Sequence, residues 1–286
     1  MRYILMKLEK EKDMHDYYSY SMETLAKESK IPVCSKGSSE DVFRLIADIM
    51  ADTIIEHNKE GKKTVFIVPV GPVGQYPFFV ERVNRERISL KNVYFFNMDE
   101  YMVDENTCID ATDRLSFRLF MNTTVYSKID EELNIPEENR FFPIPEQRKA
   151  YVETLEKLGG PDICFGGIGI NGHVAFNESD CSLTPEEFAQ LSTRTLAISR
   201  ETITANAIGD LGGAIEDMPR YASTVGMKEI LSAKKIVLGV FRPWHRAVVR
   251  RACCGEVSSS FPVSLLQNHP DAMILVNDVA AGKAVE

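Results

Sequence analysis

The sequence predicts a single doubly wound α/β domain in which a mostly parallel sheet carries helices on both faces. Three observations support this fold class. Short apolar, β-branched runs alternate with helical stretches along most of the chain. These runs are apolar almost throughout, as in strands that are buried on both faces of a sheet. Three of them end in loops rich in glycine or carboxylates, and open α/β sheets bind their ligands at such strand ends.

The predicted elements follow in order from the N-terminus. Residues 1–40 are polar and mixed, and we expect an N-terminal extension packed on one α/β domain, 41–286. Ser39, Glu40 and Asp41 precede an amphipathic pattern and predict a capped helix that runs to about His57. Five apolar runs then predict strands at 63–69, 92–98, 162–165, 235–241 and 272–276. Helical patterns separate them, notably at 113–127, 146–158 and 244–254.

Composition limits the class of protein. Hydrophobic residues make up 44% of the 286 residues and charged residues 26%, which is typical of a soluble globular chain with a sizeable core. The net charge of −9 does not favour nucleic acid or anionic membrane as a partner. No apolar run approaches the roughly 18 residues of a membrane span, and Met1–Lys10 does not resemble a signal peptide. We therefore expect a cytoplasmic protein without nucleic-acid or membrane partners.

The cysteines give no sign of a metal site. None of the six stands in a C-x-x-C pair, and their spacing is unlike that of a secreted disulfide scaffold. Free thiols and no bound metal are the expectation.

Gly166–Glu178 carries the strongest functional signal. Its sequence, GGIGINGHVAFNE, follows an apolar run and combines four glycines with His173 and Glu178. Glycines let a backbone turn tightly and approach a ligand. A histidine titrates near neutrality, and here it stands close to an acid. The segment therefore predicts an active-site loop at the end of a strand.

Part of this loop also matches a dinucleotide-binding pattern. Residues 167–172 satisfy G-x-G-x-x-G, which binds pyrophosphate only where it opens a helix. His173–Glu178 shows no helical apolar stripe, and Leu183–Pro185 is typical of a helix start rather than of the end of a second strand. We therefore disfavour a nicotinamide cofactor and expect no cofactor of any kind.

Two adjacent carboxylates, Asp99 and Glu100, directly follow the second predicted strand. A partly desolvated carboxylate at the floor of a pocket can serve as a general base. Neighbours in an extended segment point to opposite sides, so one should face a substrate while the other braces the loop. The pattern leaves open which of the two does which.

Three loops should meet at one pocket because they follow strands of one parallel sheet: Val70–Gly74, Asp99–Tyr101 and Gly166–Glu178. Within the third loop, Glu178 is suited to orient His173 while the imidazole moves a proton on and off a substrate oxygen. The alternative is a surface histidine beside an unrelated acid.

The motif FNMDEY at 96–101, together with GIGINGHVAFNE at 167–178, resembles the glucosamine-6-phosphate deaminase/isomerase family. The similarity continues through 219–226 and 265–270 and covers roughly residues 40–278. The sister 6-phosphogluconolactonase group shares the fold and the G-x-G-x-x-G-H element. That group typically has Asp-Glu-Arg after the second strand and lacks the F-N-E ending, so Tyr101 and Phe176–Glu178 favour the deaminase side.

The resemblance implies a Rossmann-like sugar-phosphate isomerase fold and the catalytic chemistry of the family. Asp99 would shuttle a proton between C2 and C1 of an open-chain amino sugar phosphate. His173 would assist ring opening, with Asn171 and Glu178 completing its relay. The implied reaction converts glucosamine 6-phosphate to fructose 6-phosphate and ammonia without metal or redox cofactor. The family also suggests assembly into a homo-oligomer.

The phosphate-binding end departs from the family pattern. Val70–Gly74 replaces a hydroxyl-rich P-T-G-G-T-P loop, and Pro72 has no N–H to offer a phosphate. Ile208 stands where the family usually has an arginine, and Arg242 or Arg246 would replace a family lysine. The residues expected to bind substrate are Gly71, Val73, Gly74, Glu100, Gly167, Ile168, Gly169, Arg194, Arg242 and Arg246.

Two other functions remain as alternatives. One is a related isomerase or hydrolase with changed specificity, including a 6-phosphogluconolactonase-like enzyme. The other is a non-catalytic sugar-phosphate sensor. The sensor is disfavoured because this chain keeps the proposed catalytic groups and changes the phosphate loop. Residues 1–40 also show no evident helix-turn-helix.

Overall fold

The computed structural model describes residues 16–285. The first fifteen residues of the expected extension, including the segment Met1–Lys10, lie outside this range. In the described part of the chain, no helix combines the length and the apolar character needed to cross a membrane.

A seven-stranded sheet forms the centre of the molecule, and every neighbouring pair of its strands is parallel. The spatial order is β1-β10-β9-β6-β2-β3-β5. This confirms the predicted fold class. The strands are β1 Val33–Ser35, β2 Thr64–Val68, β3 Val93–Asn97, β5 Arg140–Phe141, β6 Ile163–Gly166, β9 Lys235–Val240 and β10 Ala272–Val276.

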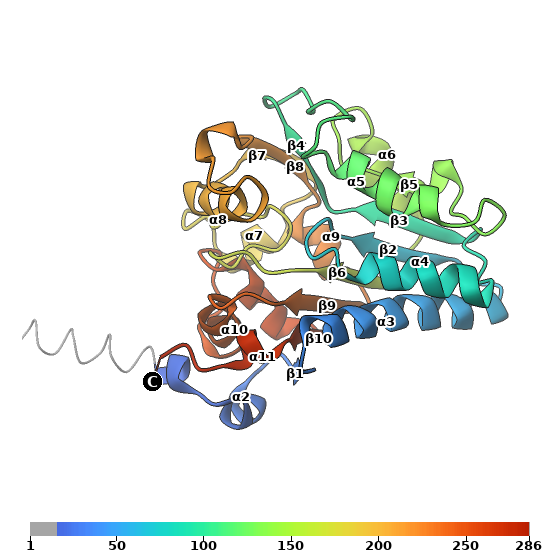
Figure 1. Cartoon of the computed structure of the whole chain (residues 1–286). Helices are drawn as coiled ribbons and strands as arrows, with labels where there is room; N and C mark the ends of the chain where they lie inside the picture. The colour runs from blue at the N-terminus through green and yellow to red at the C-terminus, as the bar shows by residue number, and fades with distance from the viewer. Residues whose placement is uncertain (1–15, 286) are drawn as a thin grey trace, which may run out of the picture.

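Helices cover both faces of this sheet (Figure 1). Alternation along β2 shows how the core divides, because neighbouring side chains in a strand point to opposite faces. Phe66 and Val68 face one hydrophobic cluster, with α3 and α4, while Val65 and Ile67 face another, with α6, α9 and α10. These helices span Ser39–Lys59 (α3), Gln75–Glu86 (α4), Arg148–Lys157 (α6), Met227–Leu231 (α9) and His245–Cys254 (α10).

The long predicted elements are confirmed. All five predicted strands form, and α3, α6 and α10 lie within two residues of their predicted bounds. The capped start of α3 uses Ser38, whose hydroxyl accepts from Asp41 N while the Asp41 carboxylate accepts from Ser38 N. The predicted helix at 113–127 is shorter, as α5 Phe117–Thr124 followed by the 3-10 turn η2 Tyr126–Lys128.

A second, three-stranded antiparallel sheet was not predicted. Its order is β4-β8-β7, with β4 Asp99–Met102, β7 Arg194–Ala197 and β8 Tyr221–Thr224. The segment Asp99–Tyr101, predicted as a loop, is therefore a strand. Four-residue strands carry little periodicity, and the β4 partner lies far along the chain, so the local pattern could not indicate the pairing.

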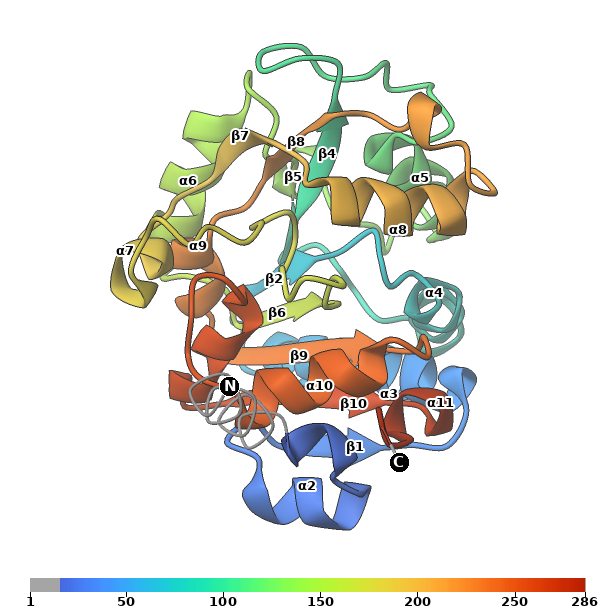
Figure 2. The same ribbon diagram turned by 90° about the vertical axis from the view of Figure 1, so that its left-hand side faces the viewer.

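The N-terminal segment joins the central sheet. β1 pairs with β10, and α2 Met22–Glu28 packs near α10 (Figure 2). The remaining short helices are α7 Pro185–Ala189, α8 Arg200–Asp210 and α11 Asp278–Ala281, and the other 3-10 turns are η1 Asp16–Ser19, η3 Glu137–Asn139, η4 Ile215–Asp217 and η5 Pro262–Asn268.

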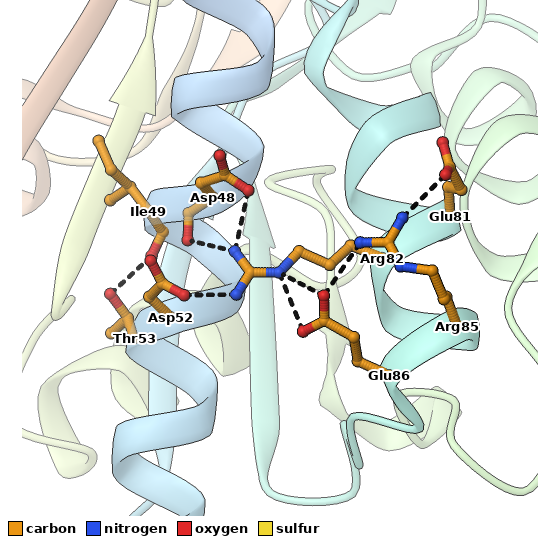
Figure 3. A network of polar contacts seen from close by, with 8 residues as sticks. All are labelled: Asp48, Ile49, Asp52, Thr53, Glu81, Arg82, Arg85 and Glu86. Carbon is orange, nitrogen blue, oxygen red and sulfur yellow. Dashed lines mark hydrogen bonds and ion pairs between the residues drawn. The ribbon is translucent and has the colours of Figure 1, made fainter.

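Arg82 joins α4 to α3 on the outer face of the molecule (Figure 3). Its guanidinium lies 2.9 Å from Asp48 and 2.6 Å from Asp52 of α3, and its Nε lies 3.1 Å from Glu86 of its own helix. Exposed ion pairs contribute little individually, so the buried apolar side chains of α3 and α4 contribute most of the stability of this contact. This packing in turn places the loop that precedes α4.

Candidate active site

The three predicted loops meet at one cavity of about 690 Å³. It lies at the carboxyl ends of β2, β3, β6 and β9, as expected for an open α/β sheet. The loops contribute Val70–Val73, Asp99 with Tyr101, and Gly167–Ile170 with His173, Ala175 and Phe176.

Asp99 faces this cavity with 8% of its surface exposed. Within residues 16–285, no side chain or backbone group forms a hydrogen bond to the Asp99 carboxylate. Burial raises the pKa of Asp99 well above its ordinary value, and the nearby Glu100 charge adds to the effect. An unpartnered buried carboxylate with a raised pKa is suited to take a proton from a bound substrate.

Glu100 points the opposite way along β4 and is fully buried. Its carboxylate accepts hydrogen bonds from Ser116 Oγ, the N–H groups of Tyr101, Phe117 and Arg118, and Arg118 Nε, all between 2.9 and 3.1 Å. Glu100 therefore braces β4 against the N-terminus of α5. It does not line the cavity, so the structure does not bring this expected substrate-binding residue to the site.

His173 and Glu178 are joined through Asn171. The His173 Nδ1 lies 2.7 Å from Asn171 Oδ1, and Asn171 Nδ2 donates to Glu178 Oε2 at 2.5 Å. The direct distance from His173 Nδ1 to Glu178 Oε2 is 3.7 Å. Because an amide oxygen only accepts, Nδ1 carries the proton and Nε2 is left with its lone pair. Ser199 N also donates to Glu178 Oε1, which holds the acid in place.

The charge state of His173 follows from its surroundings. Burial lowers its pKa, and the charge of Glu178 opposes this shift. The imidazole is therefore neutral near pH 7. A neutral imidazole with a free Nε2 can accept a proton from a sugar hydroxyl.

Two positions in this loop require glycine because neighbouring side chains leave no room for a Cβ. A Cβ at Gly169 would lie 1.9 Å from His173 Cε1, and one at Gly172 would lie 2.5 Å from the Phe261 ring. Gly172 also has φ of +83°, which favours glycine. The segment after Gly172 forms turns and no helix, and α7 begins at Pro185, as predicted. The dinucleotide pattern thus lacks the helix that it needs.

The β2–α4 loop packs close to Gly167, since a Cβ there would lie 3.2 Å from Gly71 O. Gly71, Pro72 and Val73 line the cavity, whereas Gly74 forms the N-cap of α4 without facing it. Phe43 packs against Gly74 so closely that a Cβ there would lie 2.4 Å from the ring. The bond between Gly71 and Pro72 is cis.

The three arginines that were expected to bind substrate have different placements. Arg242 lines the cavity. Arg194 instead donates to Asn177 Oδ1 at 2.9 Å, and Arg246 donates to Val279 O at 2.8 Å. The structure does not bring these two to the cavity.

Further lining residues were missed by sequence reasoning. Arg114 Nη2 donates to Asp210 O at 3.0 Å, and both residues line the cavity beside Arg242. Burial raises the pKa of Asp210, although the charges of Arg242 and Arg114 oppose it. Arg114 and Asp210 stand outside any motif, so no sequence signal marked them. The other lining residues are Ser39, Phe43, Pro69, Met98, Leu115, Ser116, Phe117, Phe120, Ala205, Asn206, Gly239, Phe241, Trp244 and His245.

We compared the sequence and the structure with those of known proteins. No family model matches the chain. The glucosamine-6-phosphate deaminase of Thermoanaerobacter pseudethanolicus is 31% identical over 250 residues, covering 85% of this chain and 90% of the relative. The deaminase of the same name from Clostridium perfringens strain 13 is 30% identical over 250 residues, covering 85% and 95%. A solved structure described as a monomeric glucosamine-6-phosphate deaminase of the NagB superfamily is 28% identical, with a TM-score of 0.74 over 88% of this chain and 99% of that one.

The fold and the cavity define an enzyme of the α/β sugar-phosphate isomerase class. The 6-phosphogluconolactonase from Trypanosoma cruzi shares this fold at 14% identity, with a TM-score of 0.62 over 88% of this chain and 96% of that one. Sequence identity of 30–31% with the two deaminases, across most of both sequences, is stronger evidence of family than a shared fold at 14% identity. The chain belongs to the glucosamine-6-phosphate deaminase family.

Proposed function

We propose that the protein is an aldose–ketose isomerase and deaminase that converts glucosamine 6-phosphate and water to fructose 6-phosphate and ammonia. The observation that carries this proposal is the pairing of two proton-transfer groups in one cavity. Asp99 supplies a buried carboxylate, and the relay of Asn171, His173 and Glu178 supplies a neutral imidazole. The names of the similar proteins support the same reaction.

Ring opening comes first in this mechanism. His173 Nε2 takes the proton of the C1 hydroxyl and returns a proton to the ring oxygen. The bond between C1 and the ring oxygen breaks, and C1 becomes an aldehyde. Asn171 and Glu178 favour the imidazolium that exists briefly between these transfers, because Glu178 places a negative charge 3.7 Å from Nδ1.

Isomerisation follows at Asp99. Its carboxylate removes the proton from C2 and delivers it to C1 through an enolamine. The C1 oxygen gains a proton and the amine nitrogen loses one, which leaves a hydroxyl at C1 and an imine at C2. Water adds to this imine, and the carbinolamine that forms expels ammonia to leave the ketose. The raised pKa of Asp99 makes it a better acceptor for the C2 proton than an ordinary aspartate.

Production of ammonia and ketose phosphate from glucosamine 6-phosphate is the direct test. Asp99→Asn keeps the shape but removes the base, so we expect turnover to fall by about 10²- to 10⁴-fold. Exchange of the C2 proton with deuterated water should fall with it. A wild-type protein that shows neither turnover nor exchange would sink the proposal.

We further propose that Arg242 and Arg114 bind the phosphate. Both arginines line the cavity, and arginine can contact phosphate with two parallel hydrogen bonds. The carboxyl group of Asp210 interacts electrostatically with both arginines, and its negative charge limits the positive potential that they create. These two arginines would take over the phosphate binding of the family's hydroxyl-rich loop.

Arg242→Ala should raise the KM for glucosamine 6-phosphate by roughly 10- to 100-fold, because a charged hydrogen bond to the phosphate is lost. Its effect on unphosphorylated glucosamine should be much smaller. Arg200→Ala is a matched control, since Arg200 lines a neighbouring hollow but not the cavity. Equal effects of Arg242→Ala on both sugars would contradict a phosphate contact.

A related sugar isomerase or hydrolase of changed specificity is the second candidate, because the altered loop at Val70–Gly74 lacks the family's hydroxyls. Turnover of other sugar phosphates and of 6-phosphogluconolactone would distinguish it. We also propose that the enzyme acts in the cytoplasm on a small molecule. Assembly into a homo-oligomer stays a prediction, and the similar solved structure is described as monomeric.

A further inference from the structure

His245 occupies an unusual position between two loops of the site. It is the first residue of α10, and 6% of its surface is exposed. Its Nδ1 accepts hydrogen bonds from the N–H groups of Phe241, at 3.2 Å, and Arg242, at 2.9 Å. Its Nε2 lies 2.9 Å from Ile168 O. Since Nδ1 only accepts, Nε2 carries the ring proton and donates it to Ile168 O.

These bonds connect two loops that line the cavity. β6 and β9 are neighbouring parallel strands, so the loops that follow them leave the same edge of the sheet. The β6 loop continues from Ile168 into a tight turn in which Gly169 N donates to His173 O at 2.9 Å. The β9 loop carries Arg242. The imidazole of His245 spans the gap between them.

His245 has no atom left for proton transfer. Both of its nitrogens are used by backbone groups, although the side chain borders the cavity. Burial lowers its pKa to about 4, so the ring stays neutral at working pH. Trp244 packs beside it, with ring centroids 3.8 Å apart.

We propose that His245 is a positioning residue that holds the His173 turn and the Arg242 loop at a fixed separation. It thereby fixes the distance between His173, proposed to transfer protons, and Arg242, proposed to bind the phosphate. The kinetic part of this inference rests on the function proposed above, whereas the bonding part does not.

Two substitutions separate the two connections. Asn places its Oδ1 near the position of the histidine Nδ1, so His245→Asn keeps the acceptor for the Arg242 loop and loses the donor to Ile168. Gln places its Nε2 near the histidine Nε2, so His245→Gln keeps the donor to Ile168 and loses the acceptor. Positioning then predicts opposite kinetic defects.

We expect His245→Asn to lower kcat by roughly 10- to 100-fold with KM nearly unchanged, because the His173 turn loosens. We expect His245→Gln to raise KM by about 10-fold with kcat nearly unchanged, because Arg242 is released. Equal changes of both parameters in both variants, or wild-type kinetics in both, would overturn the proposal.

His269 provides a matched control. Its Nε2 lies 2.8 Å from Ala233 O and its Nδ1 accepts from Asp271 N, so it makes the same kind of bonds away from the cavity. His269→Asn and His269→Gln should leave both kinetic parameters at their wild-type values. A similar split in these variants would show that the defects arise from general loosening, and would overturn the assignment to His245.

A measurement without substrate keeps the inference testable if the variants fold poorly or if the proposed reaction is wrong. The chain has five histidines, so their ¹⁵N signals can be assigned individually. In the wild-type protein, His245 should show a protonated Nε2 and a bare Nδ1 at pH 7 and should resist protonation to about pH 4. A histidine at 245 that titrates near 6.5, or that carries its proton on Nδ1, would overturn the proposal whatever the enzyme's activity.

Discussion

Burial shifts the charge states of Asp99 and His173, the two residues proposed to transfer protons, toward their neutral forms. The ionised Asp99 loses hydration and lies near Glu100, so its pKa rises. The protonated His173 also loses hydration, so its pKa falls. Burial therefore makes the Asp99 carboxylate a stronger base and protonated His173 a stronger acid.

The raised pKa of Asp99 has a consequence for stability. A carboxyl whose pKa is higher in the folded state stabilises the fold only while it is protonated, and the contribution is lost as pH rises through the folded-state pKa. At neutral pH the buried Asp99 carboxyl thus lowers the free energy of unfolding.

Asp99→Asn should therefore be more stable than the wild type at pH 7, and the difference should vanish below about pH 3.9, the ordinary aspartate pKa. Urea denaturation of both proteins across this pH range provides the measurement. A variant that is less stable at pH 7 would show that the Asp99 carboxylate has a favourable partner in the fold.

At the scale of elements, β4 determines which carboxylate serves the cavity. The pattern predicted that Asp99 and Glu100 point to opposite sides, and only the family resemblance implied that Asp99 faces the substrate. The start of α5 decides it, because the N–H groups and Arg118 gathered there accommodate the negative charge of Glu100. Asp99 is left to face the cavity.

Glu100→Gln should lower the free energy of unfolding by about 1–3 kcal/mol, because an amide cannot accept from all the donors that meet the carboxylate. Denaturant unfolding of the variant measures this. The control is Glu81→Gln, in which an exposed carboxylate paired with Arg85 is removed; there the loss should stay below about 1 kcal/mol. Similar losses in the two variants would contradict the bracing role of Glu100.

At the scale of the whole molecule, Arg250 ties the described N-terminal segment and the C-terminal helix α11 to α10. Its guanidinium is fully buried and donates to Tyr20 O, Arg246 O and Ala281 O between 2.7 and 3.1 Å. The residues around Tyr20 are thereby held on α10, the helix that begins with His245.

Arg250→Met should lower the free energy of unfolding by about 3 kcal/mol, because buried carbonyls lose their donor. Activity measured in the folded protein should be kept, since Arg250 does not line the cavity. Unfolding in urea, compared with the exposed substitution Arg85→Met, checks the expectation. A loss no larger than that of Arg85→Met would contradict the tie.

Much of the fold was predictable because its long elements carry their own patterns. The strands β2, β3, β6, β9 and β10 are apolar runs with clear ends, and the start of α3 has a capping signature. The loops after three of these strands also indicated where the cavity would form. The short strands β4, β7 and β8 were missed because their stability comes from pairing across the chain.

The sequence by itself determined the fold class, the meeting of three loops at one sheet edge and the residue types of the proton relay. The fold class follows from local hydrophobic patterns. The cavity loops were recognisable because their glycines let the backbone approach other groups closely. The local pattern left the choice between Asp99 and Glu100 open, and the tertiary structure turns Asp99 toward the cavity. It also decides that Arg242 reaches the cavity while Arg194 and Arg246 do not, and that Arg114, Asp210 and His245 line it. The physical reason is that side-chain direction depends on partners distant in sequence, which no local pattern records.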